Sequence, residues 1–216
     1  AGVSLTLSGD AEVYKRVIEL DVTGTRAYDA TDVLSDDLVN FDVTNLVAGD
    51  TLSIDFKLPA SSSDNLPVAT FGSVNAGTHS LTVNVADLVL DGASADNYEF
   101  VDAGTATTYT SAAGGVITQA ELTLAGVVLT DKTYDATDET TVFTNTGTLS
   151  GFVNGESVTL DDSSALATFA DKNAGQDKAV TLSGFGLNDG ANGGLAANYT
   201  IVLPTETVVS QRLPAL

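Results

Sequence analysis

Cysteine, methionine and tryptophan are all absent from this chain of 216 residues. The absence of cysteine excludes disulfides, thiol nucleophiles and thiolate metal ligands. Histidine occurs once, as His79, so zinc sites and nucleophiles activated by histidine have little support. We therefore expect that the protein is not an enzyme and needs no cofactor.

Basic side chains are scarce as well. Eight Lys and Arg residues stand against 29 Asp and Glu residues, which gives a formal net charge of −21. Such a charge opposes binding to nucleic acid phosphates and to anionic lipid. Long apolar runs are also missing, because no stretch approaches the roughly 18–20 apolar residues of a membrane span. We expect neither a nucleic acid partner nor insertion into a membrane.

The chain does contain a long internal repeat. The motif YDATD at residues 28–32 returns at 134–138, an offset of 106 that also matches residues 46–50 with 152–156 and so Asp50 with Glu156. Further along, the offset is 98, so the second copy has lost eight residues between the matched blocks. These later blocks are 69–71 with 167–169, 75–77 with 173–175, 91–92 with 189–190 and, at an offset of 101, 97–98 with 198–199.

A repeated unit of about 100 residues has the size of one small domain. The predicted domains are an N-terminal strand or tail at 1–16, a first repeat at 17–119, a second repeat at 120–212 and a C-terminal tail at 213–216. No Pro/Gly/Ser linker separates the repeats, so we expect a stiff, nearly continuous strand between them. The eight extra residues of the first copy are expected in a loop that holds Pro59 to Pro67, because proline cannot continue a central strand.

Alternation of apolar and polar residues predicts the fold class. It is clearest at 51–56, 80–85 and 121–124, where one face is apolar and the other is small and polar. About seven strands are predicted in the second copy, near 120–130, 141–149, 155–161, 164–170, 178–187, 198–203 and 206–212. We expect an all-β chain of two tandem antiparallel β-sandwich (Ig-like) domains, with a β-grasp-like fold as the alternative and one short helical turn within 35–47.

Four motifs of the second copy resemble the YDG repeat: KTYDAT at 132–137, GFVNGESV at 151–158, ATFADKNAG at 167–175 and ANY at 197–199. They are similar also to the mostly bacterial glycine-rich (MBG-like) repeats. The resemblance covers 120–212 well and 17–119 with more drift. It implies tandem domains in large bacterial adhesins, haemagglutinin-like exported proteins and biofilm matrix proteins. The third motif position is commonly glycine in the family but is Ala30 and Ala136 here, so the backbone at that position need not adopt a conformation open only to glycine.

Six aromatic side chains are the main structural candidates. We expect each tyrosine to pack its ring in its domain and to bond its hydroxyl to nearby backbone, and the two phenylalanines to lie in the core, because they occupy the apolar face of an alternating segment. A role for the tyrosines as ligand contacts is the alternative. The candidates are Tyr28, Tyr134, Tyr98, Tyr199, Phe71 and Phe169.

Acidic residues in the repeated motif are weak candidates for calcium. Calcium takes six to eight oxygen ligands, and two carboxylates lie close together in each copy. The spacing matches no EF-hand loop, and Asp also favours turns by bonding its own backbone. The candidates are Asp29 and Asp32 in the first copy and Asp135 and Asp138 in the second.

Tandem copies of one domain supply length or multivalency rather than one catalytic centre. We predict a structural or adhesive stalk module, extracellular or on a bacterial cell surface, whose partners are neighbouring repeats or copies of itself. One alternative is a filament subunit that adds residues 1–12 to a neighbour as a β-strand, burying Val3, Leu5 and Leu7. Another is a carbohydrate-binding module for host or matrix glycans, although an aromatic platform is hard to find without tryptophan.

Overall fold

The computed structural model describes residue 9 and residues 12–57, 67–100, 107–129, 131–140, 143–203 and 207–209. These residues form strands joined by turns, and their helical elements are four 3-10 turns of three residues each. The all-β expectation is therefore confirmed, and the short turn expected within 35–47 is η1 (Asp36–Leu38). None of the helical elements in these described ranges has the length and apolar character needed to cross a membrane.

The chain folds into two compact units that do not follow the sequence repeats in a simple way. Unit 2 holds the chain from Val116 onward, together with two short segments of the first repeat, Thr25–Asp32 and Ser73–Thr78. Unit 1 holds the rest of the first repeat. The YDATD turn of the first copy therefore belongs to the same compact body as the second copy.

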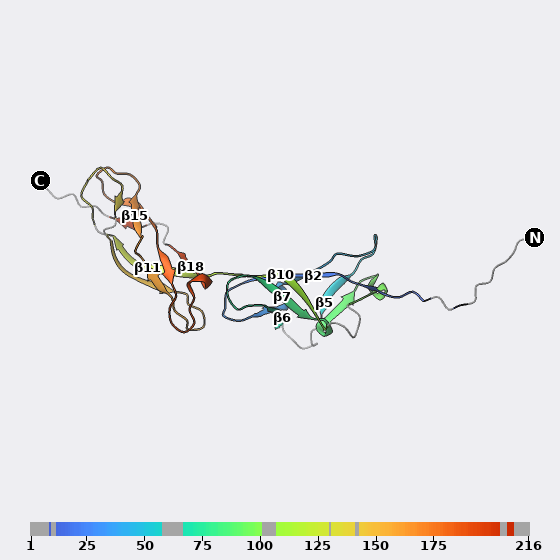
Figure 1. Ribbon diagram of the computed structural model, residues 1–216. Helices are drawn as coiled ribbons and strands as arrows, with labels where there is room; N and C mark the ends of the chain where they lie inside the picture. The colour runs from blue at the N-terminus through green and yellow to red at the C-terminus, as the bar shows by residue number, and fades with distance from the viewer. Residues whose placement is uncertain are drawn as a thin grey trace, which may run out of the picture. The chain divides into compact units, whose positions relative to one another are not determined.

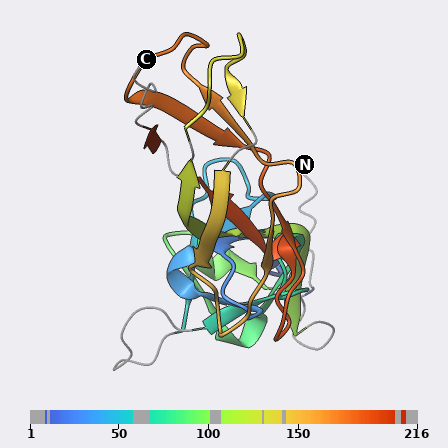
Figure 2. The ribbon, with the colours of Figure 1, turned by 90° about the vertical axis from the view of Figure 1, so that its left-hand side faces the viewer.

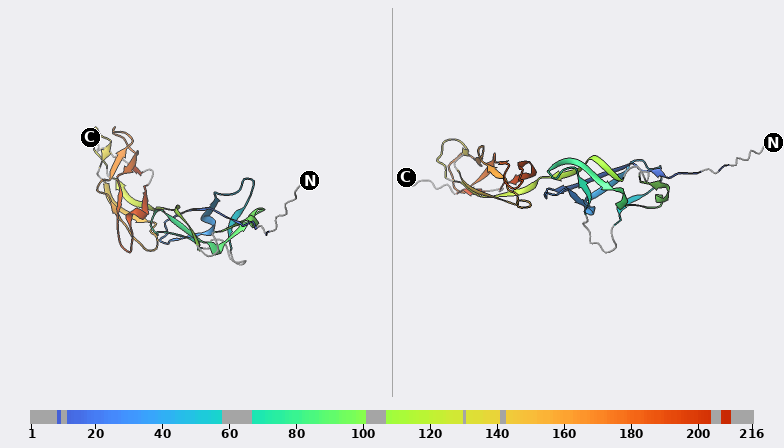
Figure 3. Two further views of the ribbon diagram at one scale, coloured as in Figure 1. Left: turned by 45° about the vertical axis from the view of Figure 1, so that its right-hand side comes forward. Right: turned by 60° about the horizontal axis from the view of Figure 1, so that its bottom comes forward.

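Unit 1 is built on a six-stranded sheet in the order β3-β6-β7-β10-β2-β4 (Figure 1). Its strands are β2 (Leu20–Ala27), β3 (Val33–Ser35), β4 (Val39–Val43), β6 (Pro67–Phe71), β7 (Gly77–Asn84) and β10 (Thr108–Thr118). Two smaller pairs complete it: antiparallel β5 (Ser53–Phe56) with β8 (Leu88–Asp91), and parallel β1 (Arg16–Val17) with β9 (Tyr98–Glu99). Figure 3 shows these strands from two further sides.

Unit 2 has a three-stranded sheet in the order β13-β11-β18, a four-stranded sheet in the order β12-β15-β16-β19, and the pair β14-β17. The strands are β11 (Ala120–Leu129), β12 (Glu139–Thr140), β13 (Phe143–Ser150), β14 (Thr159–Asp161), β15 (Leu166–Phe169), β16 (Lys178–Ser183), β17 (Gly186–Asn188), β18 (Tyr199–Val202) and β19 (Thr207–Val209). Figure 2 gives a second view of them. Only Gln119 separates β10 from β11 along the chain.

Strand pairing recurs between the two copies. Leu20 pairs with Val43 across β2 and β4, and Leu124 pairs with Leu149 across β11 and β13. The parallel pair β1-β9 likewise corresponds to β11-β18. The repeated sequence therefore produces repeated pairings. The loop expected to hold the first copy's extra residues falls mostly on residues 58–66, which lie outside the described residues, and β6 begins directly after them at Pro67.

The hairpin that follows the ATF motif is one residue longer in the second copy than in the first. Phe71 pairs with Leu81, ten residues further on (81 − 71), whereas Phe169 pairs with Val180, eleven residues further on (180 − 169). Asp177 lies in this longer turn with φ of 53°, a left-handed conformation that Asp tolerates better than most residues. The register of the hairpin is thus kept by a turn residue.

Each unit has its own apolar core. In unit 1 the buried side chains are Ile18, Val22, Leu34, Phe56, Ala69, Phe71, Leu81, Val83, Leu88 and Tyr98. In unit 2 they include Tyr28, Ile117, Leu122, Leu124, Val158, Ala167, Phe169, Val180, Leu182 and Tyr199. Phe71 and Phe169 thus lie in the two cores, where the alternation placed them.

Candidate functional site

The YDATD motif forms the same turn in both copies. In the first, Asp29 Oδ1 accepts hydrogen bonds from the backbone N–H of Thr31 at 2.8 Å and from its hydroxyl at 2.7 Å. In the second, Asp135 Oδ1 accepts the corresponding bonds from Thr137 at 2.9 Å and 2.8 Å. Asp is suited to this role because its short side chain bonds the backbone two residues further on.

The residue enclosed by this turn has a left-handed backbone. Ala30 has φ of 64° and Ala136 has φ of 70°. The left-handed region is uncommon for alanine but is not restricted to glycine, which agrees with the expectation that this position needs no glycine-only conformation. The hydrogen bonds of the Asp carboxylate fix the turn, and the alanine Cβ then bears a steric cost that glycine would avoid.

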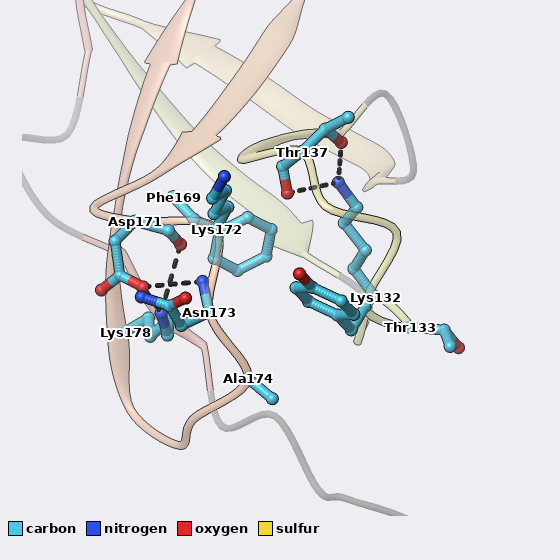
Figure 4. A pocket seen from close by; sticks show the side chains of 10 residues that line it. Lys132, Thr133, Thr137, Phe169, Asp171, Lys172, Asn173, Ala174 and Lys178 are labelled. Carbon is cyan, nitrogen blue, oxygen red and sulfur yellow. Dashed lines mark hydrogen bonds and ion pairs between the residues drawn. The ribbon is translucent and has the colours of Figure 1, made fainter.

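A basic side chain closes each turn. Arg26 forms an ion pair with Asp29 and donates to the backbone O of Thr31. Lys132 Nζ lies 2.9 Å from Asp135 Oδ1 and donates to the backbone O of Thr137 at 3.1 Å (Figure 4). The ion pair and hydrogen bond to Lys132 lower the pKa of Asp135 to about 2. Burial acts to raise the pKa of Asp29, but its bonds to Arg26 and Thr31 outweigh burial and the pKa is lowered.

Two of the four calcium candidates, Asp29 and Asp135, are hydrogen-bonded within these turns, and the other two are not. Asp29 and Asp135 face a cationic side chain of the protein. Asp138 contributes its backbone O, which accepts from the N–H of Phe169 at 2.8 Å, and Asp32 is exposed. Over the described ranges, no three His, Cys, Asp or Glu side chains are grouped so that they could hold a metal ion.

Tyr28 is buried, with 4% of its surface exposed, in a polar cluster of unit 2. Its hydroxyl donates to Glu156 Oε1 at 2.8 Å, and its ring meets that of Tyr199 edge-to-face with centroids 5.6 Å apart. Burial, followed by the bond to the Glu156 carboxylate, raises the pKa of Tyr28 to about 12. The hydroxyl therefore bonds a carboxylate rather than the nearby backbone that we expected.

Tyr199 bonds the other oxygen of the same carboxylate. Its hydroxyl donates to Glu156 Oε2 at 2.8 Å and accepts from the N–H of Val153 at 3.2 Å. Burial and the bond to Glu156 raise the pKa of Tyr199 as well. Glu156 thus joins two tyrosines, one from each sequence repeat.

Asn198 makes a second link of the same kind. The side chain is 1% exposed, Oδ1 accepts from the N–H of Ala76 at 2.8 Å, and Nδ2 donates to Asn75 Oδ1 at 3.1 Å. Tyr28 also donates its backbone N–H to the O of Thr118 at 2.8 Å. These bonds hold both first-repeat segments in unit 2. We refer to Tyr28, Asn75, Ala76, Glu156, Asn198 and Tyr199 as the filled cluster.

Unit 1 presents the equivalent acceptor without these partners. Tyr98 is 2% exposed, donates to Asp50 Oδ2 at 2.7 Å and accepts from the N–H of Val47 at 2.9 Å. Asn97, the counterpart of Asn198, is exposed. Asp50, Asn97 and Tyr98 line a cavity of about 290 Å³ with Tyr14 and neighbouring residues. We call these three residues the open acceptor.

Unit 2 presents the equivalent donor, also exposed. Tyr134 is 59% exposed, so the expectation that its ring packs in its domain is wrong. Tyr28 is covered by Tyr199 and Glu156, whereas no such pair covers Tyr134 within the part of the chain that the structure describes. Asn173 and Ala174 line the same small pocket as Tyr134. They lie in the turn where Asp171 accepts from the N–H of Asn173 at 2.8 Å (Figure 4). We call Tyr134, Asn173 and Ala174 the open donor.

Sequence reasoning did not single out Glu156, Asn198 or Asn75. The repeated pairs at 97–98 with 198–199 and at 75–76 with 173–174 were a usable signal. An asparagine that recurs beside a tyrosine expected to be buried is expected to hydrogen-bond to another polar group. The assembly candidates Val3, Leu5 and Leu7 lie outside the described residues.

A comparison with protein families gives one result for this chain. The model described as the YDG domain matches residues 14–114 and again residues 118–208. No curated protein and no solved structure is similar enough to match.

Proposed function

We propose that this chain, which belongs to the YDG domain family, is a load-bearing stalk module of an exported bacterial surface or biofilm matrix protein. Its role is to extend and transmit tension rather than to catalyse a reaction. An adhesin of the haemagglutinin-like or MBG-like kind is the proposed parent. The partners are neighbouring repeats.

The observation that carries this proposal is the parallel pairing of β11 with β18. Ala120 pairs with Tyr199 and Thr123 with Val202, so the strand that opens the second copy lies beside a strand near its end. Tension pulls the start of β11 and the end of β18 in opposite directions. Because the strands are parallel, this tension shears the whole ladder at once instead of opening it one hydrogen bond at a time. The first copy has the same arrangement in β1 and β9.

The connection between β10 and β11 supports the same role. A single residue, Gln119, separates the two strands, and Gln119 itself donates to the backbone O of Ala197 at 3.0 Å. A short, bonded connection passes tension on without first uncoiling. The filled cluster adds links from Tyr28 and Ala76 to the second copy.

We also propose that each repeat is a β-sandwich. Unit 2 supports this, because side chains of its two larger sheets contribute to one core, as sandwiched sheets do. Ala167 and Phe169 on β15 and Val180 and Leu182 on β16 form a cluster against which Val127 and Leu129 of β11 pack. The Ig-like variant of the sandwich is the form we favour.

Composition supports an extracellular location. For an exported protein, the lack of cysteine favours a bacterial surface over a disulfide-stapled extracellular module, and the net charge of −21 favours solubility at high local density. The filament alternative, in which residues 1–12 add to a neighbour as a strand, is tested by deleting those residues. Loss of any polymers seen by size-exclusion chromatography and electron microscopy would support it.

The stalk proposal is tested by pulling unit 2 in two directions. The chain has no native cysteine, so introduced cysteines are unique handles. Gln119→Cys with Val202→Cys applies tension at opposite ends of the β11-β18 ladder and shears it. Gln119→Cys with Ala197→Cys applies tension at one end, where these residues are hydrogen-bonded, and peels the strands apart.

Both double variants place handles on exposed positions, so they are matched controls for one another. In single-molecule force spectroscopy, we expect the shearing pair to unfold at several times the force of the peeling pair. Equal forces in the two directions would contradict a load-bearing role for this ladder.

A further inference from the structure

We infer that the open donor of one molecule binds the open acceptor of a second copy, so that the chain associates head to tail through the contacts seen in the filled cluster. The inference deepens the proposed role as a structural repeat and rests on it. The partner is a second copy of this chain, and the interface is made by Tyr134 and Asn173 on one molecule and by Asp50 and Asn97 on the other.

The first argument is identity of the parts. Within unit 2, the pairs that meet are Tyr28 with Glu156 and Ala76 with Asn198. The open donor offers the same side chain in Tyr134 and the same Asn-Ala turn at 173–174. The open acceptor offers an amide in Asn97 and a carboxylate in Asp50. Every group that makes the filled cluster is thus present a second time.

The Asp50 carboxylate has a second oxygen that can accept a hydrogen bond from another tyrosine. In the filled cluster, Glu156 receives Tyr199 on one oxygen and Tyr28 on the other. In the open acceptor, Asp50 receives Tyr98 on Oδ2 at 2.7 Å. Its Oδ1 corresponds to the Glu156 oxygen that accepts the tyrosine of the first repeat. Tyr134 supplies that hydroxyl in our proposal.

Equivalent residues before β1 and β11 differ in how much of their surface is exposed. Val13 precedes Arg16 by three residues as Ile117 precedes Ala120, and Arg16 and Ala120 pair with Tyr98 and Tyr199 in the same register. Ile117 is 1% exposed, whereas Val13 is 98% exposed.

By the same register, Tyr14 stands where Thr118 accepts the backbone N–H of Tyr28. Tyr14 is 82% exposed, and it lines the cavity of about 290 Å³ with Asp50, Asn97 and Tyr98. An apolar and a polar surface are therefore uncovered together, which is typical of an interface without its partner.

Charge and side-chain length make the association weak. Asp50 is one methylene shorter than Glu156, so the tyrosine hydroxyl must approach more closely to reach the carboxylate. Two copies with a net charge of −21 each also repel one another, and salt screens that repulsion. We expect association in the range of high protein concentration and moderate salt. Because donor and acceptor differ, the contact is heterologous and leads to open chains rather than closed dimers.

The test uses full-length variants that each lose one half of the interface. Tyr134→Ala removes the donor and keeps the acceptor, whereas Asn97→Leu removes the acceptor amide and keeps the donor. Both side chains are exposed in the free chain, so unchanged melting curves will show that the variants fold. Masses are measured by sedimentation equilibrium up to about 1 mM protein, the range of effective concentration within tandem arrays, with added sodium chloride.

We expect the average mass of the wild-type chain to rise with concentration past that of a dimer. Each variant alone should stay monomeric, and an equimolar mixture of the two should form a dimer and no larger species. A monomeric wild-type chain at the highest concentration, a monomeric mixture, or variants that assemble like the wild type would each overturn the inference. The pulling experiment on single molecules is independent of self-association, so failure here is distinguishable from failure of the stalk proposal.

Discussion

Tyr28 and Tyr134 occupy the same place in two copies of one turn, with the same Asp carboxylate bonding the same Thr. Tyr28 is 4% exposed and Tyr134 is 59% exposed. The local motif is therefore complete in both copies, and the difference comes from what covers the ring. Glu156 and Tyr199 contact Tyr28 from the copy that follows it in sequence. The tyrosine of the first YDATD turn is thus covered by residues of the second repeat.

The acceptors differ in the same way. Asn198 is buried and bonded to Asn75 and Ala76, whereas Asn97 is exposed. Each asparagine is the last residue of a three-residue 3-10 turn, η3 (Ala95–Asn97) and η4 (Ala196–Asn198). The turn positions the amide, and the amide is buried only where the segment with Asn75 and Ala76 packs against it.

The largest difference in stability should be the one between alanine variants of Tyr28 and Tyr134. Tyr28→Ala removes a buried ring from unit 2 and should destabilise it by about 3–5 kcal/mol, whereas Tyr134→Ala should change stability by less than about 0.5 kcal/mol. Urea unfolding followed by circular dichroism measures both. Equal losses for the two variants would break the comparison.

Asn198→Ala and Asn97→Ala apply the same comparison to the acceptors. Asn198→Ala leaves the N–H of Ala76 without its bonded partner and should cost about 1–3 kcal/mol. Asn97→Ala should be close to neutral, because that side chain is exposed. Hydrogen exchange at Ala76 gives a local reading, and protection that persists in Asn198→Ala would argue against the bond.

Sequence alone predicted the strands better than their partners. Alternation at 121–124 predicted β11, because a half-buried strand has a period of two. The lack of a Pro/Gly/Ser linker predicted that a strand would lead into it, which is β10. It did not predict that Thr25–Asp32 and Ser73–Thr78 belong with the second copy, since that depends on contacts across more than 100 residues, such as Tyr28 with Glu156.

The left-handed alanines are a second point that sequence reasoning missed. Alanine carries no local sign of positive φ, and the turn is imposed by the preceding Asp. The family's usual glycine at this position was the available signal. Because this chain has alanine there, its sequence alone did not predict the positive φ.

Replacing those alanines with glycine should stabilise both copies modestly. Ala30→Gly and Ala136→Gly remove a Cβ from a left-handed position, and each should raise the free energy of unfolding by about 0.5–1 kcal/mol. Ala112→Gly is the control, because Ala112 is exposed on β10 with an ordinary strand backbone, and this change should destabilise. Thermal melts rank the three variants, and a loss of stability in both Ala30→Gly and Ala136→Gly would contradict the turn geometry.

The titration of Tyr28 makes stability depend on pH only in alkali, because its pKa lies far above neutral. The folded state raises the pKa of Tyr28 from 10.0 to about 12, chiefly by burial and then by the bond to Glu156. The resulting stabilisation is fully present below pH 10 and is lost as pH rises through about 12. Stability measured between these values should fall less steeply in Tyr28→Phe than in the wild type, with tyrosinate absorbance recording ionisation. Identical slopes would show that Tyr28 is not protected.

The most direct measurement of the central claim, that the second repeat completes the turn of the first, is the coupling free energy between Tyr28 and Glu156. A double-mutant cycle with Tyr28→Phe and Glu156→Ala should give a coupling of about 1.5–3 kcal/mol, as expected for a part-buried hydrogen bond to a charged group. The matched cycle of Tyr134→Phe with Glu156→Ala should give a coupling near zero. A Tyr28–Glu156 coupling indistinguishable from that control would contradict the account.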